Sequence, residues 1–388
     1  MATTPKYPNP IPLNKPSLNG SVLERLRQVI ETGNPGGDGG ECKAVEQKLC
    51  DLFSVRHALL TTSCTHALEM AMMLLDLHPG DEVILPSFTF VSTANAILRG
   101  GGRPVFCEIN DRTLTLDLED FQRRITKRTR AVVPVHYAGI SAEMDEIMGI
   151  ARDRGLAVVE DAAQGVNAKY RGRYLGTIGD SGAYSFHVTK NYISGEGGAL
   201  VTNKEALARR AEIIREKGTN RSNFLRGEVD KYTWVDEGSS YVLSDLLAAV
   251  LRSQLEDREL IQSGRKRVHE RYMSGLRDLE QRGKLRLPNV PAYCTSNYHI
   301  FYILLNSESE RTMVMHRLKE SGISSAFHYV PLHSSPYARA RLGTESLQLP
   351  VTDRIYGGLL RLPIYPQLKD AEVDYVVERL GSILRPPA

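Results

Sequence analysis

Two short motifs place side chains suited to group-transfer chemistry after apolar segments. VVEDAAQG delivers Asp161 and Gln164, and SFHVTKN contains Ser185 and Lys190. Ligands gather at the carboxyl ends of strands in open α/β sheets. Taken alone, Asp161 would be an ordinary helix cap. A lysine flanked by Phe186 and a glycine-rich turn is a poor candidate for a solvated charge, so the two motifs together indicate a reactive site.

These residue types fit a pyridoxal cofactor. Such a cofactor acts as an electron sink only while its ring nitrogen stays protonated, and a carboxylate beside it, here Asp161, enforces that state. Lys190 is expected to bind the cofactor as an imine and later to move the proton between substrate and cofactor. The sequence therefore predicts Lys190 as the catalytic residue. Pyridoxal 5'-phosphate is the predicted cofactor, with pyridoxamine 5'-phosphate as its intermediate form.

The cofactor's phosphate and ring need further partners. A phosphate is bound by backbone N–H groups and hydroxyls near a helix N-terminus, and TTSCTHAL supplies them through Ser63, Cys64 and Thr65. In isolation, Ser63 and Thr65 would be an ordinary helix N-cap. The segment PSFTFVST offers Phe88 and Phe90, of which one is expected to stack on the ring and the other to lie in the core.

The elements that position these residues follow an α/β pattern. Between residues 41 and 201, short β-rich runs alternate with helical patterns, which predicts a mostly parallel sheet buried on both faces. A long helical pattern at 244–282 precedes a smaller α+β unit. We expect a large cofactor-binding domain with an N-terminal arm at 1–245, and a linking helix with a small domain at 246–388. The predicted strands of the sheet are 57–61, 82–85, 104–108, 131–136, 156–161, 183–186 and 199–202.

The composition excludes several classes of protein. The chain has 388 residues, 41% hydrophobic and 24% charged, without a run of about 18 apolar residues. No membrane association is expected, and the polar first 20 residues predict a cytoplasmic location. The five cysteines are odd in number and lack a CxxC pair, so no disulfide framework and no metal site are predicted.

Charge and glycine patterns argue against nucleic-acid and dinucleotide binding. The 49 basic and 46 acidic residues are well mixed and give a net charge of +3, so no nucleic-acid partner is expected. The basic stretches 123–130 and 265–271 are interpreted as charged surface. The glycine-rich segment 33–40 matches no nucleotide-binding fingerprint, and a dehydrogenase therefore loses support.

Six motifs, in order, resemble one family. PGDEVILPSFTFVSTANAI, PVHYAG, VVEDAAQG, SFHVTKN with GEGGALV, EIIREKGTNRS and FHYVPLH are similar to the DegT/DnrJ/EryC1/StrS family of sugar-nucleotide aminotransferases, fold-type-I enzymes that use pyridoxal phosphate. The resemblance covers residues 12–384. GDGGE, GTNRSNFLRGEVDKYTW and GSSYVLSD resemble the branch that acts on dTDP-4-keto-6-deoxy-D-glucose. It implies L-glutamate as the amino donor, and a dTDP-4-amino-4,6-dideoxyhexose and 2-oxoglutarate as products.

The same resemblance implies a homodimer with shared active sites, and it assigns roles to individual residues. Relatives often have glycine where Cys64 stands, and an asparagine that reaches the neighbouring subunit's phosphate where this chain has Ser240. Ser240 would have to replace that asparagine, with Asn220 or Arg221 as alternatives. The implied cofactor contacts are Lys190 at the aldehyde, Asp161 at the ring nitrogen, Gln164 near the ring hydroxyl, Phe90 on the ring face, and Ser185 with Ser63, Cys64 and Thr65 at the phosphate.

Four further residues are candidates for binding the nucleotide sugar. His328 and His333, in FHYVPLH, are expected near the sugar, although lone histidines in an apolar strand are more often structural. Lys231 and Arg221 are candidate diphosphate contacts or, alternatively, solvated loop charges.

Two other functions are compatible with this scaffold. Sugar dehydratases of similar sequence carry histidine in place of the reactive lysine, and a regulatory protein would be expected to lose the lysine or the aspartate. Lys190 and Asp161 are both present. The sequence does not predict the stereochemistry of the product amine, the nucleotide or the pathway.

Overall fold

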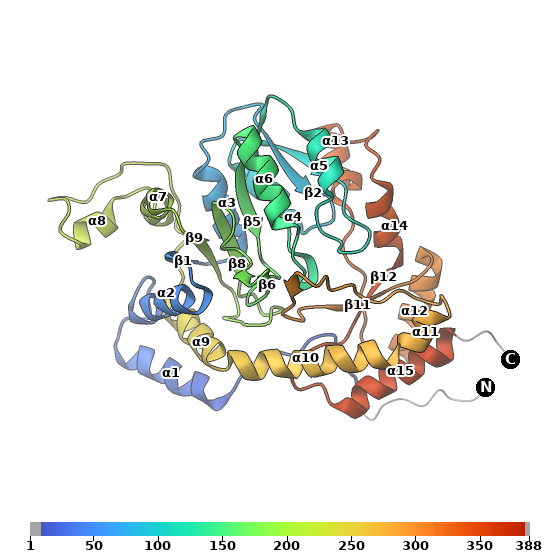
Figure 1. Ribbon diagram of the computed structural model, residues 1–388. Coiled ribbons are helices and arrows are strands. Elements are labelled where there is room, and N and C mark those ends of the chain that lie inside the picture. The colour runs from blue at the N-terminus through green and yellow to red at the C-terminus, as the bar shows by residue number, and fades with distance from the viewer. Residues whose placement is uncertain (1–8, 385–388) are drawn as a thin grey trace.

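The structure is a computed structural model that describes residues 9–384, and a seven-stranded sheet runs through its larger part (Figure 1). The strands lie in the order β1 (His57–Thr61), β9 (Gly198–Thr202), β8 (Ser181–Ser185), β5 (Ala157–Asp161), β4 (Thr129–Val132), β2 (Glu82–Pro86) and β3 (Arg103–Cys107). The five strands from β8 to β3 are parallel, whereas β9 runs antiparallel to both neighbours. The predicted α/β class with a mostly parallel sheet is confirmed.

Helices cover both faces of the sheet, which is why most residues of its strands are buried. All five residues of β2, EVILP, are buried. One face packs with α2 (Gly40–Phe53), α5 (Leu118–Arg124), α6 (Met144–Arg154) and α9 (Asp245–Glu256). The other packs with α3 (Cys64–Met73), α4 (Val91–Arg99) and α7 (Glu205–Arg215). Helix α1 (Gly20–Glu31) lies outside this layer, against α9.

The long helical pattern predicted at 244–282 is three helices. Helix α9 is followed by α10 (Arg258–Gly275) and α11 (Arg277–Gln281), and α9 and α10 meet at a bend (Figure 1). The helices are interrupted at Asp257, where ψ is 12°, and at Leu276, which stays in the right-handed helical region but with ψ of −3°. Apolar residues keep their helical spacing across both breaks, so the sequence pattern does not predict where the helices end.

The chain beyond α11 builds a smaller unit with its own hydrophobic core. Strands β11 (Phe301–Leu304) and β12 (Leu359–Leu362) pair antiparallel and pack with α10, α12 (Glu308–Glu320) and α15 (Asp370–Leu384). Ile11 lies in this core too, which ties the N-terminal segment to it. The domain division at residue 245 stays a prediction. The remaining elements are β6 (Lys169–Tyr170), β7 (Arg173–Tyr174), β10 (Cys294–Thr295), η1 (Tyr137–Gly139), α8 (Arg221–Leu225), η2 (Leu332–Ser334), α13 (Pro336–Leu342) and α14 (Pro350–Gly358).

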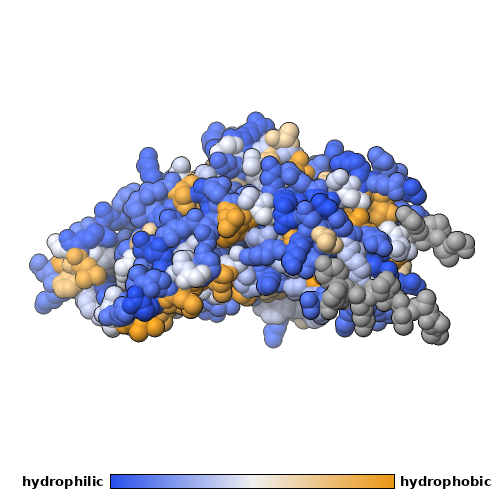
Figure 2. Space-filling view, turned by 90° about the horizontal axis from the view of Figure 1, so that it is seen from below, coloured by the Kyte–Doolittle hydropathy of each residue, from blue (hydrophilic) through white to orange (hydrophobic). Residues whose placement is uncertain are grey.

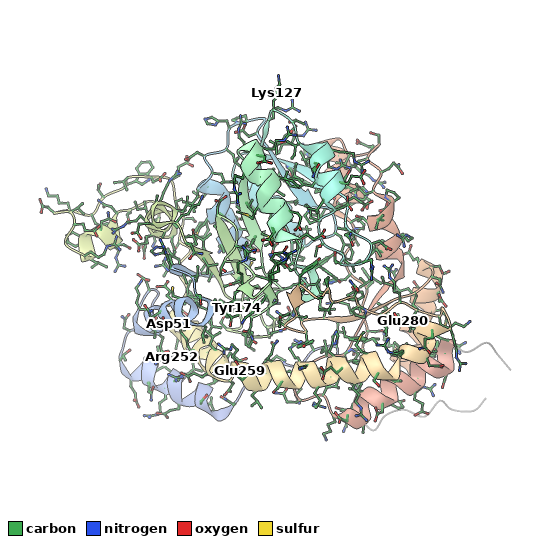
Figure 3. The ribbon with its side chains drawn as sticks, in the orientation of Figure 1. Asp51, Lys127, Tyr174, Arg252, Glu259 and Glu280 are labelled. Carbon is green, nitrogen blue, oxygen red and sulfur yellow. The ribbon has the colours of Figure 1, made fainter. Side chains whose placement is uncertain are left out.

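Most of the two basic stretches lies on the surface, with one exception. Lys127 extends outward from its loop (Figure 3), and Arg128 and Arg124 form ion pairs with carboxylates. Arg265, by contrast, is 2% exposed and donates to the carbonyl of His299 at 3.1 Å. The prediction of a charged surface is therefore wrong for Arg265.

The face of the molecule that lies at the bottom of Figure 1 is mostly hydrophilic, with small scattered hydrophobic patches (Figure 2). No helix within residues 9–384 is long and apolar enough to cross a membrane.

Candidate active site

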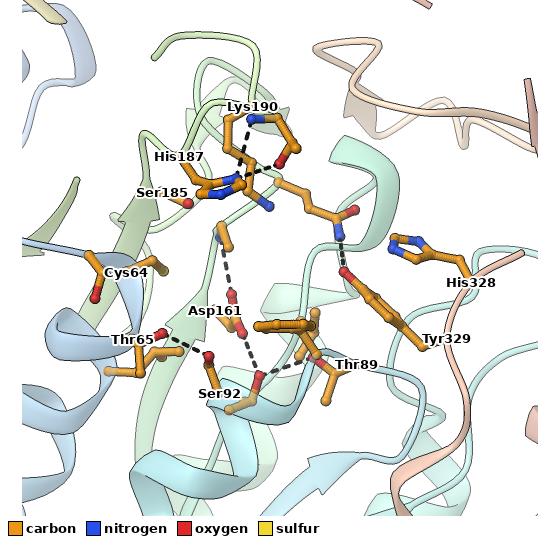
Figure 4. A pocket seen from close by; sticks show the side chains of 18 of the residues that line it. Cys64, Thr65, Thr89, Ser92, Asp161, Ser185, His187, Lys190, His328 and Tyr329 are labelled. Atoms are coloured by element: carbon orange, nitrogen blue, oxygen red, sulfur yellow. Dashed lines mark hydrogen bonds between the residues drawn. The ribbon is translucent and has the colours of Figure 1, made fainter. Parts of the chain in front are cut away.

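A cavity of ≈ 460 Å³ lies where β5 and β8 end and α3 begins (Figure 4). Its walls come from residues far apart in the sequence, because the parallel strands deliver their carboxyl ends to one edge of the sheet. Of the predicted site residues it brings together Ser63, Cys64, Thr65, Phe90, Asp161, Gln164, Ser185, Lys190 and His328.

The start of α3 forms one end of the cavity. Ser63 is the N-cap, and its Oγ accepts the N–H of His66 at 3.2 Å. The N–H groups of Cys64 and Thr65 have no partner within residues 9–384, as expected in a first helical turn. Strand β9 passes directly beneath: a Cβ on Gly198 would lie 2.4 Å from the Cys64 nitrogen. The start of α3 therefore presents two backbone N–H donors in fixed positions.

Asp161 ends β5 at the centre of the cavity. The side chain is held at both oxygens: Oδ2 accepts the Thr93 hydroxyl at 2.7 Å, and Oδ1 accepts the N–H of Ala163 at 3.1 Å. The residue is 5% exposed. Each carboxylate oxygen has a second lone pair available, so Asp161 can accept a further proton donor from a bound ligand without reorienting.

Lys190 follows β8 in a turn closed by its own N–H, which donates to the His187 carbonyl at 2.9 Å. Its amine makes no hydrogen bond or ion pair within the described part of the chain. Burial lowers the pKa of the Lys190 amine, the positive charge of Arg361 adds to that effect, and the negative charge of Asp161 opposes it. A lowered pKa increases the neutral, nucleophilic fraction of the amine.

The opposite wall is a hydrogen-bonded aromatic cluster. Gln164 accepts the N–H of Ala138 at 2.7 Å and donates to the Tyr329 hydroxyl at 3.0 Å. The rings of His328 and Tyr329 lie 3.6 Å apart. Burial lowers the pKa of His328 to about 2, and the Tyr137 hydroxyl lies 3.1 Å from its Nδ1. Burial raises the pKa of Tyr137, so Tyr137 keeps its proton and its hydroxyl forms a hydrogen bond with Nδ1 of a neutral imidazole. The other ring nitrogen, Nε2, has no partner among the described residues and is available to a ligand.

The two phenylalanines of PSFTFVST have different surroundings. Phe88 is 1% exposed and packs on Tyr137, with ring centroids 5.0 Å apart. Phe90 lines the cavity, is 56% exposed and lies 6.1 Å from the ring of Tyr329. Phe88 is the core residue, and Phe90 keeps a free face.

The structure does not bring His333 into the cavity. Its ring is 3% exposed, its Nδ1 is hydrogen-bonded to Ser87 at 2.8 Å, and Asp353 lies 3.5 Å from its Nε2. Both ring nitrogens are thus occupied by side chains of the same chain. The expectation that His333 contacts the sugar is replaced by a structural role that anchors η2 to the end of β2.

Ser240, Arg221 and Lys231 also lie outside their own chain's cavity. All three are exposed, and none lines the cavity. Arg221 begins α8 and lies 3.5 Å from the carboxylate of Glu216, whereas Ser240 pairs with the backbone of Glu216.

Three cavity residues escape prediction from the sequence. Thr93 orients Asp161, Tyr329 holds Gln164, and Arg361 lines the wall beside His328. Tyr329 follows His328 in the motif FHYVPLH, so its position in that motif could have indicated it. The run LLRLP is typical of an ordinary strand in which Arg361 faces outward. The pattern around Thr93 is typical of a helix.

The cavity fits pyridoxal phosphate on its own chemistry. It offers an unpartnered amine at Lys190, a buried carboxylate at Asp161, and unpaired N–H groups at the start of α3. Burial raises the pKa of the Cys64 thiol well above its usual value, so no thiolate opposes a phosphate there. Among residues 9–384, no group of three or more His, Cys, Asp or Glu side chains is arranged to hold a metal ion.

Comparison with known proteins agrees with this fit. SpsC, a spore coat polysaccharide biosynthesis protein of Bacillus subtilis, is 32% identical over 97% of this chain and 97% of its own length. The aminotransferase TlmJ from Streptoalloteichus hindustanus is 31% identical, with a TM-score of 0.89 over 97% of this chain and 99% of its own. DesI, solved in the presence of its TDP-sugar product, is 27% identical, with a TM-score of 0.88 over 98% and 94%.

The fold and the site define a pyridoxal-phosphate-dependent aminotransferase. The model of the DegT/DnrJ/EryC1/StrS aminotransferase family matches residues 16–381, and the chain belongs to that family. It is a sugar aminotransferase, and pyridoxal phosphate is its cofactor.

Proposed function

We propose that this enzyme transfers the amino group of L-glutamate to C4 of dTDP-4-keto-6-deoxy-D-glucose, in the cytoplasm, giving a dTDP-4-amino-4,6-dideoxyhexose and 2-oxoglutarate. The observation that carries the chemistry is the unpaired amine of Lys190 in one cavity with the buried Asp161. The sugar nucleotide is supported by the branch-specific motifs and by the TDP-sugar product of DesI.

Lys190 and Asp161 divide the catalytic work in this proposal. Bound pyridoxal phosphate supplies an electron sink for the charge that develops on the reacting carbon. Asp161, fixed by Thr93 and Ala163, holds a proton on the ring nitrogen of the cofactor. Lys190 would hold the cofactor through Nζ. As a free amine it would move the proton, and its lowered pKa increases the neutral fraction that can act as a base.

The phosphate belongs at the start of α3. The free N–H groups of Cys64 and Thr65 point from the positive end of the helix, and the hydroxyls of Ser63 and Ser185 line the same cavity. Cys64 occupies a position where relatives often have glycine, but its contribution comes from the backbone and is independent of its side chain.

The ring and the sugar belong between the phosphate site and the aromatic wall. Phe90 offers a free face for stacking, and Gln164 is held by Ala138 and Tyr329 with its amide at the cavity. The neutral His328 offers Nε2 for a hydrogen bond with a hydroxyl of the sugar.

We infer that the enzyme is a homodimer with shared sites. Helix α8 and the loop after it extend away from the body of the subunit (Figure 1), and a second copy would cover their apolar side chains. In the partner's cavity, Ser240 would contact the cofactor phosphate, and Lys231 and Arg221 the nucleotide diphosphate. The exposed apolar side chains of this segment are Phe224, Leu225, Tyr232, Trp234 and Val235, with exposed fractions from 42% to 77%.

The test is reconstitution with pyridoxal phosphate, L-glutamate and dTDP-4-keto-6-deoxy-D-glucose, followed by NMR of the product. A 4-amino sugar is expected, and its H3–H4 coupling distinguishes the galacto from the gluco product. Lys190→Ala should abolish turnover while the circular dichroism spectrum is unchanged. Absence of visible absorbance after adding the cofactor to the wild-type protein, or turnover by Lys190→Ala, would refute the proposal.

A further inference from the structure

Arg361 lines the cavity and has no role in the proposed chemistry. Arg361 lies in β12 between Leu360 and Leu362, which are 0% and 1% exposed. Its side chain lines both the ≈ 460 Å³ cavity and an adjoining cavity of ≈ 170 Å³, and Lys190 lines both as well. The β11–β12 pair of the smaller unit thus holds a guanidinium close to the reactive amine of the larger one.

The Arg361 guanidinium has no partner in the part of the chain that the structure describes. Its Nε is buried without a hydrogen bond, and within residues 9–384 no carboxylate forms an ion pair with it. The buried arginines Arg215, Arg265 and Arg311 each donate to a carboxylate or a carbonyl. A partly buried cation without a partner destabilises the folded protein, because its lost hydration is not replaced. An anion from solution is therefore the expected partner of Arg361.

The position of Arg361 excludes the cofactor phosphate as that anion. The adjoining cavity is lined by Arg361, His328 and Tyr329 and by no residue of the α3 start. Figure 4 shows Cys64 and Thr65 on one side of Asp161, and His328 and Tyr329 on the other. The arginine and the phosphate donors therefore lie at opposite ends of the site.

We propose that Arg361 binds the α-carboxylate of the amino donor. This inference rests on the proposed transamination. The α-carboxylate is attached to the carbon that carries the reacting amine, so it stays near the place that Lys190 reaches. The diphosphate of a nucleotide sugar is attached across the ring from C4, farther from that place. The planar guanidinium matches a carboxylate through two parallel hydrogen bonds.

The surroundings of Arg361 favour such an anion. Its neighbour His328 is neutral, because burial lowers its pKa to about 2, and burial raises the pKa of Tyr329, which therefore keeps its proton. No negative side chain at this end of the cavity competes for the guanidinium. The proposal therefore makes Arg361 the residue that selects α-amino acids as donors.

The test follows the donor half-reaction alone. Holoenzyme without nucleotide sugar is mixed with L-glutamate, or with γ-aminobutyrate, which lacks only the α-carboxylate, and the loss of visible absorbance gives a dissociation constant. Arg361→Gln should weaken L-glutamate binding about 10- to 100-fold and bring the two donors closer together. Arg361→Lys should lie between, because the charge remains and the planar fork does not. Calorimetric binding of 2-oxoglutarate to holoenzyme should weaken in parallel.

Arg379→Gln is the matched control. Arg379 also has a buried Nε without a partner, but it lies in α15 and lines neither cavity, so its variant should behave as the wild type. Unchanged L-glutamate binding by Arg361→Gln would overturn the inference, as would a raised KM for the nucleotide sugar with unchanged L-glutamate binding, which would assign Arg361 to the diphosphate. A wild-type protein that binds the cofactor yet neither reacts with L-glutamate nor binds 2-oxoglutarate would overturn both this inference and the choice of donor. Failure to bind the cofactor would overturn the proposed function itself.

Discussion

At the scale of single residues, the two carboxylate oxygens of Asp161 have different hydrogen-bond partners. Oδ2 accepts the Thr93 hydroxyl and Oδ1 accepts the backbone of Ala163, so the carboxylate is oriented before any ligand binds. Orientation and charge are separable, because Asp161→Asn removes the charge with little change of shape, whereas Thr93→Val removes one donor and leaves the charge.

We predict that Asp161→Asn lowers turnover by about 10- to 1,000-fold, because an opposite charge at this distance shifts the pKa of a neighbouring group by about 1 to 3 units. Thr93→Val should cost less. Steady-state kinetics with L-glutamate and the keto sugar measure both, and the visible absorbance shows whether the cofactor is still bound. An Asp161→Asn enzyme with wild-type turnover would remove Asp161 from the mechanism.

The sequence predicted those site residues whose side-chain chemistry and whose position after an apolar strand both indicate a site. Lys190, Asp161 and Gln164 follow apolar strands, so both signals mark them, and the structure brings them into one cavity. Arg361 carries no such signal, because its partner in this interpretation is a substrate. His333 shows the reverse error: its motif is right, but Ser87, distant in sequence, takes its ring nitrogen.

At the scale of elements, the contact between β9 and the start of α3 sets the phosphate site. Gly198 lets the strand pass beneath the free N–H groups, and a Cβ there would lie 2.4 Å from the Cys64 nitrogen, a backbone atom that cannot rotate away. Helix α3 would have to shift.

We predict that Gly198→Ala destabilises the protein by about 1 to 3 kcal/mol and weakens pyridoxal phosphate binding. Gly149→Ala is the matched control: that glycine lies within α6 with nothing near its Cβ position, so the change should stabilise the protein by about 0.5 to 1 kcal/mol. Chemical denaturation and cofactor titration measure the two effects. Equal cofactor affinity in both variants would contradict the role of this contact.

The sheet was predictable from sequence because each buried parallel strand is a short apolar run between helical patterns. The predicted 82–85 and 199–202 are β2 and β9 to within one residue. The breaks at Asp257 and Leu276 were not, since periodic apolar residues specify the buried face of a helix and not its continuity. The two-residue strands β6, β7 and β10 are too short to show any alternation.

At the scale of the whole molecule, acid sensitivity follows from buried histidines. His269 of α10 is 6% exposed, and burial lowers its pKa to about 4. Because this value lies below that of an unfolded histidine, about 6.5, the unfolded state binds a proton first as the pH falls. The stabilisation is complete above about pH 6.5 and is lost progressively toward pH 4.

We predict that His269→Phe reduces the loss of stability between pH 7 and pH 5 by about 2 kcal/mol. Phenylalanine suits the site because the ring packs on Tyr298 and Phe301, each with centroids 5.1 Å away. Urea denaturation at the two pH values measures the difference. The variant should retain the acid sensitivity of His299, whose pKa burial also lowers. A variant with the wild-type pH dependence would contradict the assignment.

The proposed dimer makes its own prediction, because residues of one chain would complete the cavity of the other. Lys190→Ala should be inactive through its own site, and an Arg221→Ala, Lys231→Ala double variant through its partner's. In a mixed dimer of the two, one site carries all the defects and the other carries none. Mixing the inactive proteins after gentle dissociation should therefore restore activity, with light scattering confirming the dimer. Each pure variant treated alike serves as the control. If mixing restores nothing while mixed dimers form, each site is built from one chain, and Arg221 and Lys231 are ordinary charges of the exposed segment around α8.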